Sequence, residues 1–208
     1  SSTYAFSIVV ALFLIGLAIL YGVMGTLSMA DVAAKVALIP QGDRGLLHAG
    51  AAILAMAFLI KAAVWPLNAW LVPAYTAAST PVAALFVLMT KVGVYSVLRV
   101  WMLLFPADLA SSVQFGGPLL LGAGLVTLAF GAIGVLASIR LDRIAAFSII
   151  VTSGTLLASF ATGSIAASAA ALFYLVSSTF AVSALFLMVE PVQRTRSERH
   201  AQRPHYDT

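Results

Sequence analysis

Long apolar segments separated by short polar ones dominate this sequence. Hydrophobic residues make up 62% of the chain and charged residues 9%, whereas a soluble domain carries about 25% charged residues. A chain with so few charges cannot cover a water-facing surface. Because every backbone polar group must find a partner inside lipid, helices of about 20 residues are the economical way to cross a bilayer. The sequence therefore predicts an all-α, polytopic membrane helix bundle.

The apolar segments divide into about six expected transmembrane spans. The first, third and fourth spans are expected at Tyr4–Met24, Val82–Phe105 and Pro118–Ser138. The second begins at Leu46 and ends between Trp65 and Leu71. The fifth and sixth lie within Ile144–Val189, with a turn near Gly163 and Ser164, and the sixth covers Ser168–Val189. The fourth span carries Gly122, Gly124, Gly131 and Gly134, which should permit close helix contact. We expect residues 1–190 to form the transmembrane part and residues 191–208 a polar, basic, frayed tail.

The distribution of positive charge predicts the orientation of the bundle. Six spans place both ends on one side, which also carries Arg140, Arg143, Arg194, Arg196, Arg199 and Arg203. The other side carries Lys35 and Arg44, and at most Arg99 in addition. Positive residues accumulate on the cytoplasmic side, so we expect both ends in the cytoplasm. The same rule explains the basic tail as a determinant of topology rather than as a nucleic-acid-binding patch.

Two lysines, Lys61 and Lys91, lie inside apolar sequence long enough to cross the membrane. Keeping a lysine charged at mid-bilayer costs roughly 2.5–3.5 kcal/mol, and removing its proton near pH 7 costs roughly 4.6 kcal/mol. These costs are comparable, so a buried amine can take up and release a proton. We therefore expect Lys91, near the middle of its span, to carry protons. Two interpretations of Lys61 stay open. It either carries protons as well, or its long side chain extends so that the amine reaches the membrane interface.

Pro66 follows Lys61 closely and predicts an irregular helix. A proline inside a helix removes a hydrogen bond and kinks the chain. The helix either ends at Trp65 or breaks and resumes as far as Leu71, and the sequence favours the break. Broken helices at membrane depth are tolerated where they line a cavity.

Hydroxyl and aromatic side chains mark two further helix faces. Lys91, Tyr95 and Arg99 share one face of the third span, and Ser148, Thr152, Thr155 and Ser159 share one face of the fifth. The hydroxyl stripe supports either a chain of water molecules or contacts between helices.

The sequence offers little else that carries chemistry. No Asp or Glu lies within the six expected spans, so the two lysines work through water and hydroxyls or through an acid outside this chain. The chain has no cysteine, and His200 and His205 have no partners at metal-site spacing. It contains no glycine-rich phosphate loop and no haem or flavin motif. We expect no cofactor, no metal and no enzymatic reaction.

Two motifs carry a resemblance to a known family, KAAVWPLNAWL and STPVAALFVLMTKVGVYSVLRV. They resemble the core of the antiporter-like membrane subunits, which occur in Mrp or Pha multisubunit cation:proton antiporters and in proton-pumping respiratory complex I. TKVGVYSVLR, YGVMGTLSMADVAAKV and AALFYLVSSTFAVSALFLMVE resemble the D-type antiporter subunits in particular. The resemblance implies a bundle of about fourteen helices with inverted repeats. It places Lys61 on the family's broken seventh helix and Lys91 on its eighth, both implicated in proton translocation.

The chain departs from the family pattern at three positions. Asn68 stands where many relatives have histidine, Val72 where the same motif has proline, and Ser177 where a histidine is common. The family's glutamate on its fifth helix would precede Ser1, and its lysine on the twelfth helix would follow the last residue. The chain also begins without methionine, so we expect a central fragment of a longer protein.

These observations predict a proton-translocating membrane subunit of a multisubunit Na⁺(K⁺)/H⁺ antiporter in a bacterial cytoplasmic membrane, with other antiporter subunits as partners. Lys61 and Lys91 would carry the protons. The expected supporting residues are Pro66, Trp70, Tyr95, Ser148, Thr152, Thr155 and Ser177. One alternative is a pumping subunit of an NADH:quinone oxidoreductase or a related hydrogenase. Another is a truncated, inactive membrane scaffold.

Overall fold

The computed structural model describes residues 2–105 and 116–201. Within these ranges the helices are α1 (Ser2–Met24), α2 (Met29–Lys35), α3 (Arg44–Lys61), α4 (Leu71–Ala77), α5 (Thr80–Leu104), α6 (Gly117–Leu136), α7 (Leu141–Ala161) and α8 (Ile165–Ala201). Two short 3₁₀ turns, η1 (Val36–Leu38) and η2 (Gln41–Asp43), join α2 to α3.

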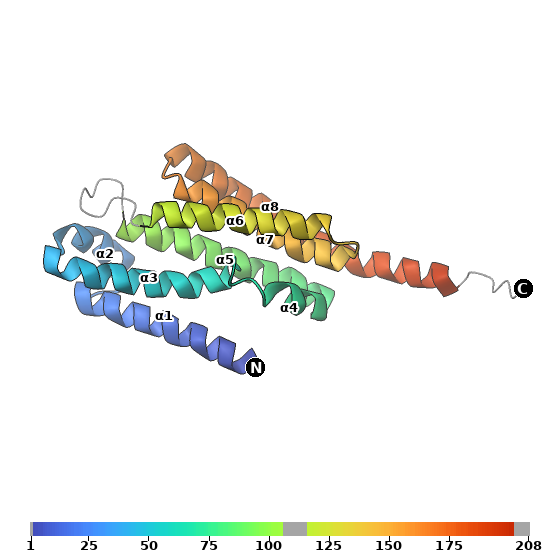
Figure 1. Cartoon of the computed structure of the whole chain (residues 1–208), viewed down its shortest axis with the longest axis horizontal. Coiled ribbons are helices and arrows are strands. Elements are labelled where there is room, and N and C mark those ends of the chain that lie inside the picture. The colour runs from blue at the N-terminus through green and yellow to red at the C-terminus, as the bar shows by residue number, and fades with distance from the viewer. Residues whose placement is uncertain (1, 106–115, 202–208) are drawn as a thin grey trace, which may run out of the picture.

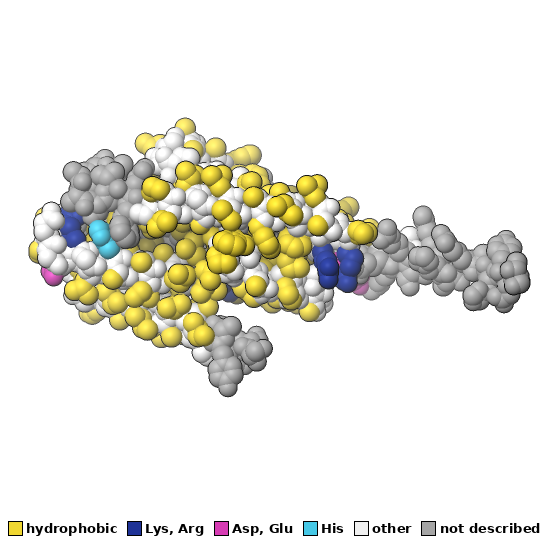
Figure 2. Space-filling model, viewed as in Figure 1, with side chains coloured by type: hydrophobic (Ala, Val, Ile, Leu, Met, Phe, Trp, Pro, Cys, Tyr) yellow, Lys and Arg dark blue, Asp and Glu magenta, His cyan; other side chains and the backbone are white. Residues whose placement is uncertain are grey.

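Six of these helices, α1, α3, α5, α6, α7 and α8, are long and apolar enough to cross a membrane. The predicted all-α membrane bundle is therefore confirmed. Figure 2 shows hydrophobic side chains covering the long face of the molecule, while charged and histidine side chains gather mostly at its two ends. Such a surface suits a lipid environment along its length and water at its ends.

Helix α5 lies at the centre of the bundle. In Figure 1, α3 and then α1 lie on one side of it, and α6, α7 and α8 on the other. The contacts agree, because α5 packs against α3, α7 and α8, while α1 packs along α3 and α6 along α7. The beginning of α1 and the end of α8 point to the same end of the bundle, as an even number of crossings requires (Figure 1).

The expected polar connection between the first two spans contains a helix that the sequence did not reveal. Val32 of α2 and Val36 of η1 are buried in one apolar cluster with Leu20, Leu47 and Leu104. These buried valines, and not the polar residues around them, hold the connection against the ends of α1, α3 and α5.

Glycines allow α6 and α7 to approach closely. A Cβ atom added to Gly124 would lie 2.7 Å from the backbone nitrogen of Ala158, and one added to Gly131 would lie 2.7 Å from that of Val151. Gly134 is crowded by the ring of Phe147. The expectation was wrong for Gly122, which faces away from α7, because none of the described residues lies within 4 Å of a Cβ added there.

The broken helix is confirmed, but its bounds differ from those expected. Helix α3 ends at Lys61, before Trp65, and helix resumes only at Leu71 as the short α4. Ala63 has the left-handed backbone angle φ of 55°, and the Val64 N–H reaches back to the Leu59 carbonyl at 3.1 Å. The chain therefore leaves the helix before it reaches Pro66.

Two expectations near the helix ends need correction. Helix α7 begins at Leu141, so Asp142 lies within a spanning helix and is only 7% exposed. The carboxylate accepts a hydrogen bond from Arg140 Nε at 3.1 Å, and this bond raises the pKa of Arg140 above its ordinary value. Residues 191–208 were expected to form a frayed tail, but α8 continues through Pro191 to Ala201, and residues 202–208 lie outside the described part of the chain.

Candidate functional site

Lys91 is buried in the middle of the bundle. It lies on α5, is 2% exposed, and donates a hydrogen bond to Thr152 Oγ1 of α7. The Thr152 hydroxyl in turn donates to the Ile149 carbonyl at 2.9 Å. Thr152 therefore offers a lone pair to an ammonium group, and its own hydrogen is already committed to the backbone of α7.

Lys61 lies at the same depth although it ends a helix. The end of α3 packs against Gly93, where an added Cβ would be 3.0 Å from the Ala62 nitrogen and 3.2 Å from the Lys61 carbonyl carbon. Gly93 lies near the middle of α5, which is about 37 Å long at 1.5 Å per residue. The backbone at the end of α3 is thus buried against the middle of α5, and the Lys61 side chain is half-buried there.

The two lysines lie on different sides of α5. Lys91 and Gly93 are two residues apart, which corresponds to about 200° around a helix. Gly93 faces the end of α3, so Lys91 points the other way, toward α7. Helix α5 therefore separates two amines at one depth.

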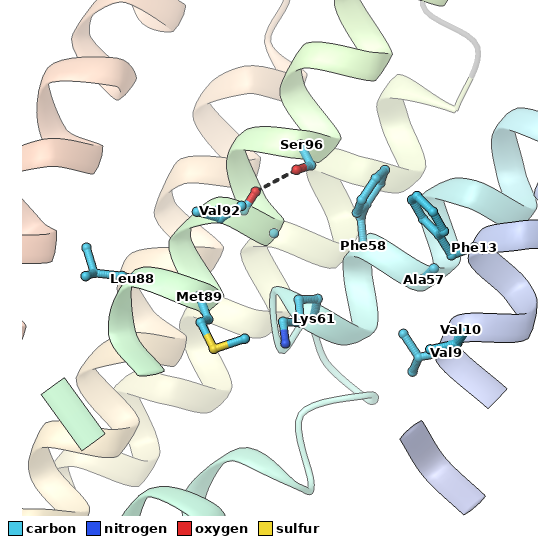
Figure 3. A pocket seen from close by; sticks show the side chains of 11 residues that line it. Val9, Val10, Phe13, Ala57, Phe58, Lys61, Leu88, Met89, Val92 and Ser96 are labelled. Atoms are coloured by element: carbon cyan, nitrogen blue, oxygen red, sulfur yellow. Dashed lines mark hydrogen bonds between the residues drawn. The ribbon is translucent and has the colours of Figure 1, made fainter. Parts of the chain in front are cut away.

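Lys61 extends into a cavity between α1, α3 and α5. The cavity has a volume of about 440 Å³, and Lys61 is the only titratable side chain among the described residues that line it. Figure 3 shows the amine between Met89 of α5 and Val9 and Val10 of α1. No hydrogen-bond or ion-pair partner for this amine lies among the described residues. A cation in such surroundings requires water or an anionic group.

The segment between α3 and α4 is held by two side chains. Trp70 donates from its indole Nε1 to the Ile60 carbonyl at 3.0 Å, which also accepts the Ala63 N–H at 3.1 Å. The backbone N–H of Trp65 donates to Thr127 Oγ1 of α6 at 2.9 Å. Pro66 is exposed and follows a cis peptide bond.

Polar groups are also buried in this segment and in α5 and α7, the helices that contact α4. Asn68 is 4% exposed and Ser153 of α7 is 0% exposed. The Asn68 amide nitrogen and the Ser153 hydroxyl have no hydrogen-bond partner within the described part of the chain. Tyr75 and Thr90 share a hydrogen bond of 2.7 Å in the adjoining core. Buried polar atoms without protein partners in a native interior generally bind water.

The structure brings together only part of the predicted hydroxyl stripe. Thr152 contacts Lys91. The other three hydroxyls donate to carbonyls of their own helix, Ser148 to Ile144 at 2.8 Å, Thr155 to Val151 at 2.9 Å and Ser159 to Thr155 at 2.8 Å. Such bonds within one turn are common for Ser and Thr in helices. The stripe therefore joins neither helices nor lysines, except at Thr152.

The predicted face of α5 also separates into two environments. Tyr95 is exposed and accepts a hydrogen bond from Arg99 at 3.4 Å, in a second hollow between α2, α5 and α8. Lys91 does not line this hollow. Ser177 is exposed on α8 and donates to the Tyr174 carbonyl at 3.2 Å.

Sequence reasoning missed Thr127 and Ser153, and it noted Asn68 only as a departure from a motif. Both lie in apolar helices, where the local sequence shows neither the bond of Thr127 to Trp65 on another segment nor the complete burial of Ser153. Within the described residues, no group of three or more His, Cys, Asp or Glu could hold a metal ion.

Residues 2–204 match the family described as "NADH:quinone oxidoreductase/Mrp antiporter, TM". The chain belongs to this family. The resemblance that the two lysine motifs indicated is confirmed.

Among curated relatives of this family member, the D subunit of a probable K⁺/H⁺ antiporter from Rhizobium meliloti (strain 1021) is 50% identical over 186 residues. That alignment covers 89% of this chain and 34% of the relative. The D subunit of the Na⁺/H⁺ antiporter from Bacillus subtilis (strain 168) is 36% identical over 179 residues, covering 86% of this chain and 35% of the relative. The chain thus spans about a third of the length of these relatives.

Solved structures show the same helix arrangement. The Mrp complex from Dietzia sp. DQ12-45-1b contains a chain with a TM-score of 0.77 and 27% identity, over 89% of this chain and 34% of that one. A chain of the membrane-bound sulfane sulfur reductase, an archaeal respiratory membrane complex, gives a TM-score of 0.78 at 26% identity, over 87% of this chain and 36% of that one. The described bundle is therefore a fold shared by antiporter and respiratory assemblies.

Proposed function

We propose that this chain is the proton-carrying part of a subunit in a multisubunit Na⁺/H⁺ or K⁺/H⁺ antiporter, and that it works only with partner subunits. The observation that carries the proposal is the pair of lysines at one depth in the protein interior. Both named relatives are D-type antiporter subunits, one for K⁺ and one for Na⁺. We place the protein in a bacterial cytoplasmic membrane with both ends of this chain in the cytoplasm. In this arrangement residues 1–190 form the membrane part and residues 191–208 a basic cytoplasmic segment.

The surroundings of the lysines support proton exchange with water. Lys61 faces a cavity of about 440 Å³ with otherwise mostly apolar walls, so water in it would be bound by the amine and by Ser96. Between the break and α7, the Asn68 amide and the Ser153 hydroxyl would each bind a water molecule. Thr152 would stabilise the charged form of Lys91. A proton would thus pass between Lys61 and Lys91 around α5, through water held by these groups.

The anionic partner of Lys61 would come from outside this chain. The cavity is lined by apolar side chains apart from Lys61 and Ser96, so nothing in its described walls neutralises the ammonium. The family resemblance supplies a glutamate-bearing helix for this role. In this proposal the chain holds no redox or hydrolytic centre of its own, and its task is transport.

The redox alternative has weaker support. The likeness to a respiratory membrane complex reflects a shared fold, whereas the relative with 50% identity carries an antiporter name. Flavin and iron–sulfur proteins encoded beside this sequence would favour the alternative.

A transport assay tests the proposal. The complete subunit containing this sequence is expressed with its partners in a host that lacks its own antiporters, and everted vesicles report the collapse of a pH gradient on adding Na⁺ or K⁺. We expect Lys61→Ala and Lys91→Ala to abolish the signal while the complex still co-purifies. Lys35→Ala is the control, because Lys35 is exposed at the end of the bundle and donates only to the Met24 carbonyl, at 3.3 Å.

Two results would contradict the proposal. Parent rates in assembled Lys91→Ala would remove Lys91 from the proton path. An assembled parent complex with no cation-dependent signal would leave the inactive scaffold as the better interpretation.

A further inference from the structure

The N–H of Trp65 bonds to an unexpected acceptor. In an uninterrupted helix each N–H bonds to the carbonyl four residues earlier, which for Trp65 belongs to Lys61. Here the Trp65 N–H donates instead to Thr127 Oγ1 of α6 at 2.9 Å. The bond joins residues 62 positions apart in the sequence, and it takes the place of the helical hydrogen bond from the Trp65 N–H to the Lys61 carbonyl.

Thr127 is well suited to hold this bond. It is 0% exposed, and its hydroxyl donates to the Ala123 carbonyl at 2.6 Å. The hydrogen of the hydroxyl is thereby directed along α6, and a lone pair remains for the Trp65 N–H. A buried N–H without an acceptor is costly, so the hydroxyl favours the unwound course of the chain over a continued helix.

The position of Thr127 along α6 links both lysines to one helix pair. Thr127 lies between Gly124 and Gly131, which pack against Ala158 and Val151 of α7. Thr152, the partner of Lys91, lies on the same stretch of α7. The closely packed pair α6–α7 therefore provides the partner of one lysine and the anchor of the segment that follows the other.

We propose that Thr127 is a positioning residue for proton transfer, because its bond to Trp65 holds the unwound segment so that Lys61 stays level with Lys91. The inference rests on the proposed function of Lys61. The Thr127 hydroxyl itself contacts no proton-carrying group. The segment itself does not line the cavity, and among the described residues that do, Lys61 is the only titratable group, so a displaced segment acts on transport and on its pH profile by moving that amine.

The test compares Thr127→Val with Thr127→Ser in the complete subunit, assembled with its partners. Valine has nearly the shape of threonine and cannot accept the hydrogen bond, whereas serine can. Thr179→Val is the matched control, since Thr179 is also buried, at 7% exposed, and donates only to the Leu175 carbonyl of its own helix.

Two readouts are measured on each variant. Hydrogen exchange of the Trp65 amide should accelerate about tenfold or more in Thr127→Val, because the loss of a buried partner opens the segment. The antiport rate should fall severalfold and its pH profile should shift. Thr127→Ser and Thr179→Val should match the parent in both readouts. If Thr127→Val does not assemble, Thr127→Ala against Thr127→Ser carries the same comparison, because alanine removes the hydroxyl without adding bulk.

The outcomes separate this inference from the proposed function. Unchanged exchange in Thr127→Val overturns the anchoring bond, and faster exchange with a parent rate and pH profile overturns the positioning role. Lys61→Ala is measured in parallel. If that variant transports at the parent rate, the proposed role of Lys61 fails, and the positioning role of Thr127 fails with it even if the exchange of Trp65 accelerates.

Discussion

Thr152→Val should move the pH dependence of antiport to lower pH. In the structure the Thr152 hydroxyl accepts a hydrogen bond from the Lys91 amine and donates its own hydrogen to the Ile149 carbonyl at 2.9 Å. It therefore stabilises the ammonium form of Lys91 and offers no donor to the neutral amine. Removing it should cause the amine to release its proton at lower pH.

The magnitude follows from the kind of bond that is lost. Hydrogen bonds to charged groups contribute about 1.5–3 kcal/mol, and 1.36 kcal/mol corresponds to one pH unit. Because Lys91 is only 2% exposed, water outside the bundle does little to replace the bond. The shift should therefore approach about 1–2 pH units, and Thr152→Ser should restore the parent profile.

The assay measures initial rates of cation-driven proton movement in everted vesicles across a range of pH, with assembly checked by co-purification. Thr155→Val is the matched control, because the Thr155 hydroxyl donates only to the Val151 carbonyl of its own helix. A Thr152→Val profile that superimposes on that of the parent, in a fully assembled complex, would refute the role assigned to this bond.

Three further substitutions test the packing around the site. Gly154→Ala should destabilise the assembled subunit by about 1–3 kcal/mol, because the new Cβ would lie within 2.8 Å of the Leu128 backbone; thermal unfolding of the purified complex measures the loss. Gly122→Ala should not lower the unfolding temperature, since none of the described residues lies within 4 Å of its added Cβ and alanine favours helix over glycine. Equal losses in both variants would contradict the described α6–α7 contact. Tyr75→Phe should cost about 1 kcal/mol by removing the buried 2.7 Å bond to Thr90, and an unchanged unfolding temperature would argue against that bond.

The spans could be predicted because hydropathy and helix length are local properties. The apolar segments around Lys91 and after Asp142 needed only a count of consecutive apolar residues. The short α2 escaped prediction because its burial depends on distant helices, with Val32 packed in the cluster that contains Leu20 and Leu104.

The position of the break could be predicted only in part. Pro66 indicated an interruption, yet the helix ends five residues earlier, at Lys61. The Trp65 N–H, which a continued helix would bond to the Lys61 carbonyl, donates instead to Thr127, a residue on another helix that the local sequence cannot reveal. For the same reason the sequence left the depth of Lys61 open, since the end of a helix need not lie at the end of a membrane crossing.

The candidate site shows the same division between local and distant information. A lysine within a long apolar segment identified Lys91, and helical spacing identified Thr152 as one hydroxyl of a stripe. Spacing could not show that, of the four hydroxyls, only that of Thr152 contacts a lysine. Thr155 is also a threonine, one turn further along the same helix, and its hydroxyl bonds only to its own helix.

The central claim is that Lys91 gains and loses a proton inside the bundle during transport. Its most direct test is NMR of isotope-labelled lysine side chains in the assembled antiporter, titrated across the pH range in which the complex transports, with Lys91→Arg used to assign the signal. We expect the Lys91 amine signal to change between its charged and neutral positions within that range. A signal that stays at the charged position throughout, while transport continues, would contradict the account.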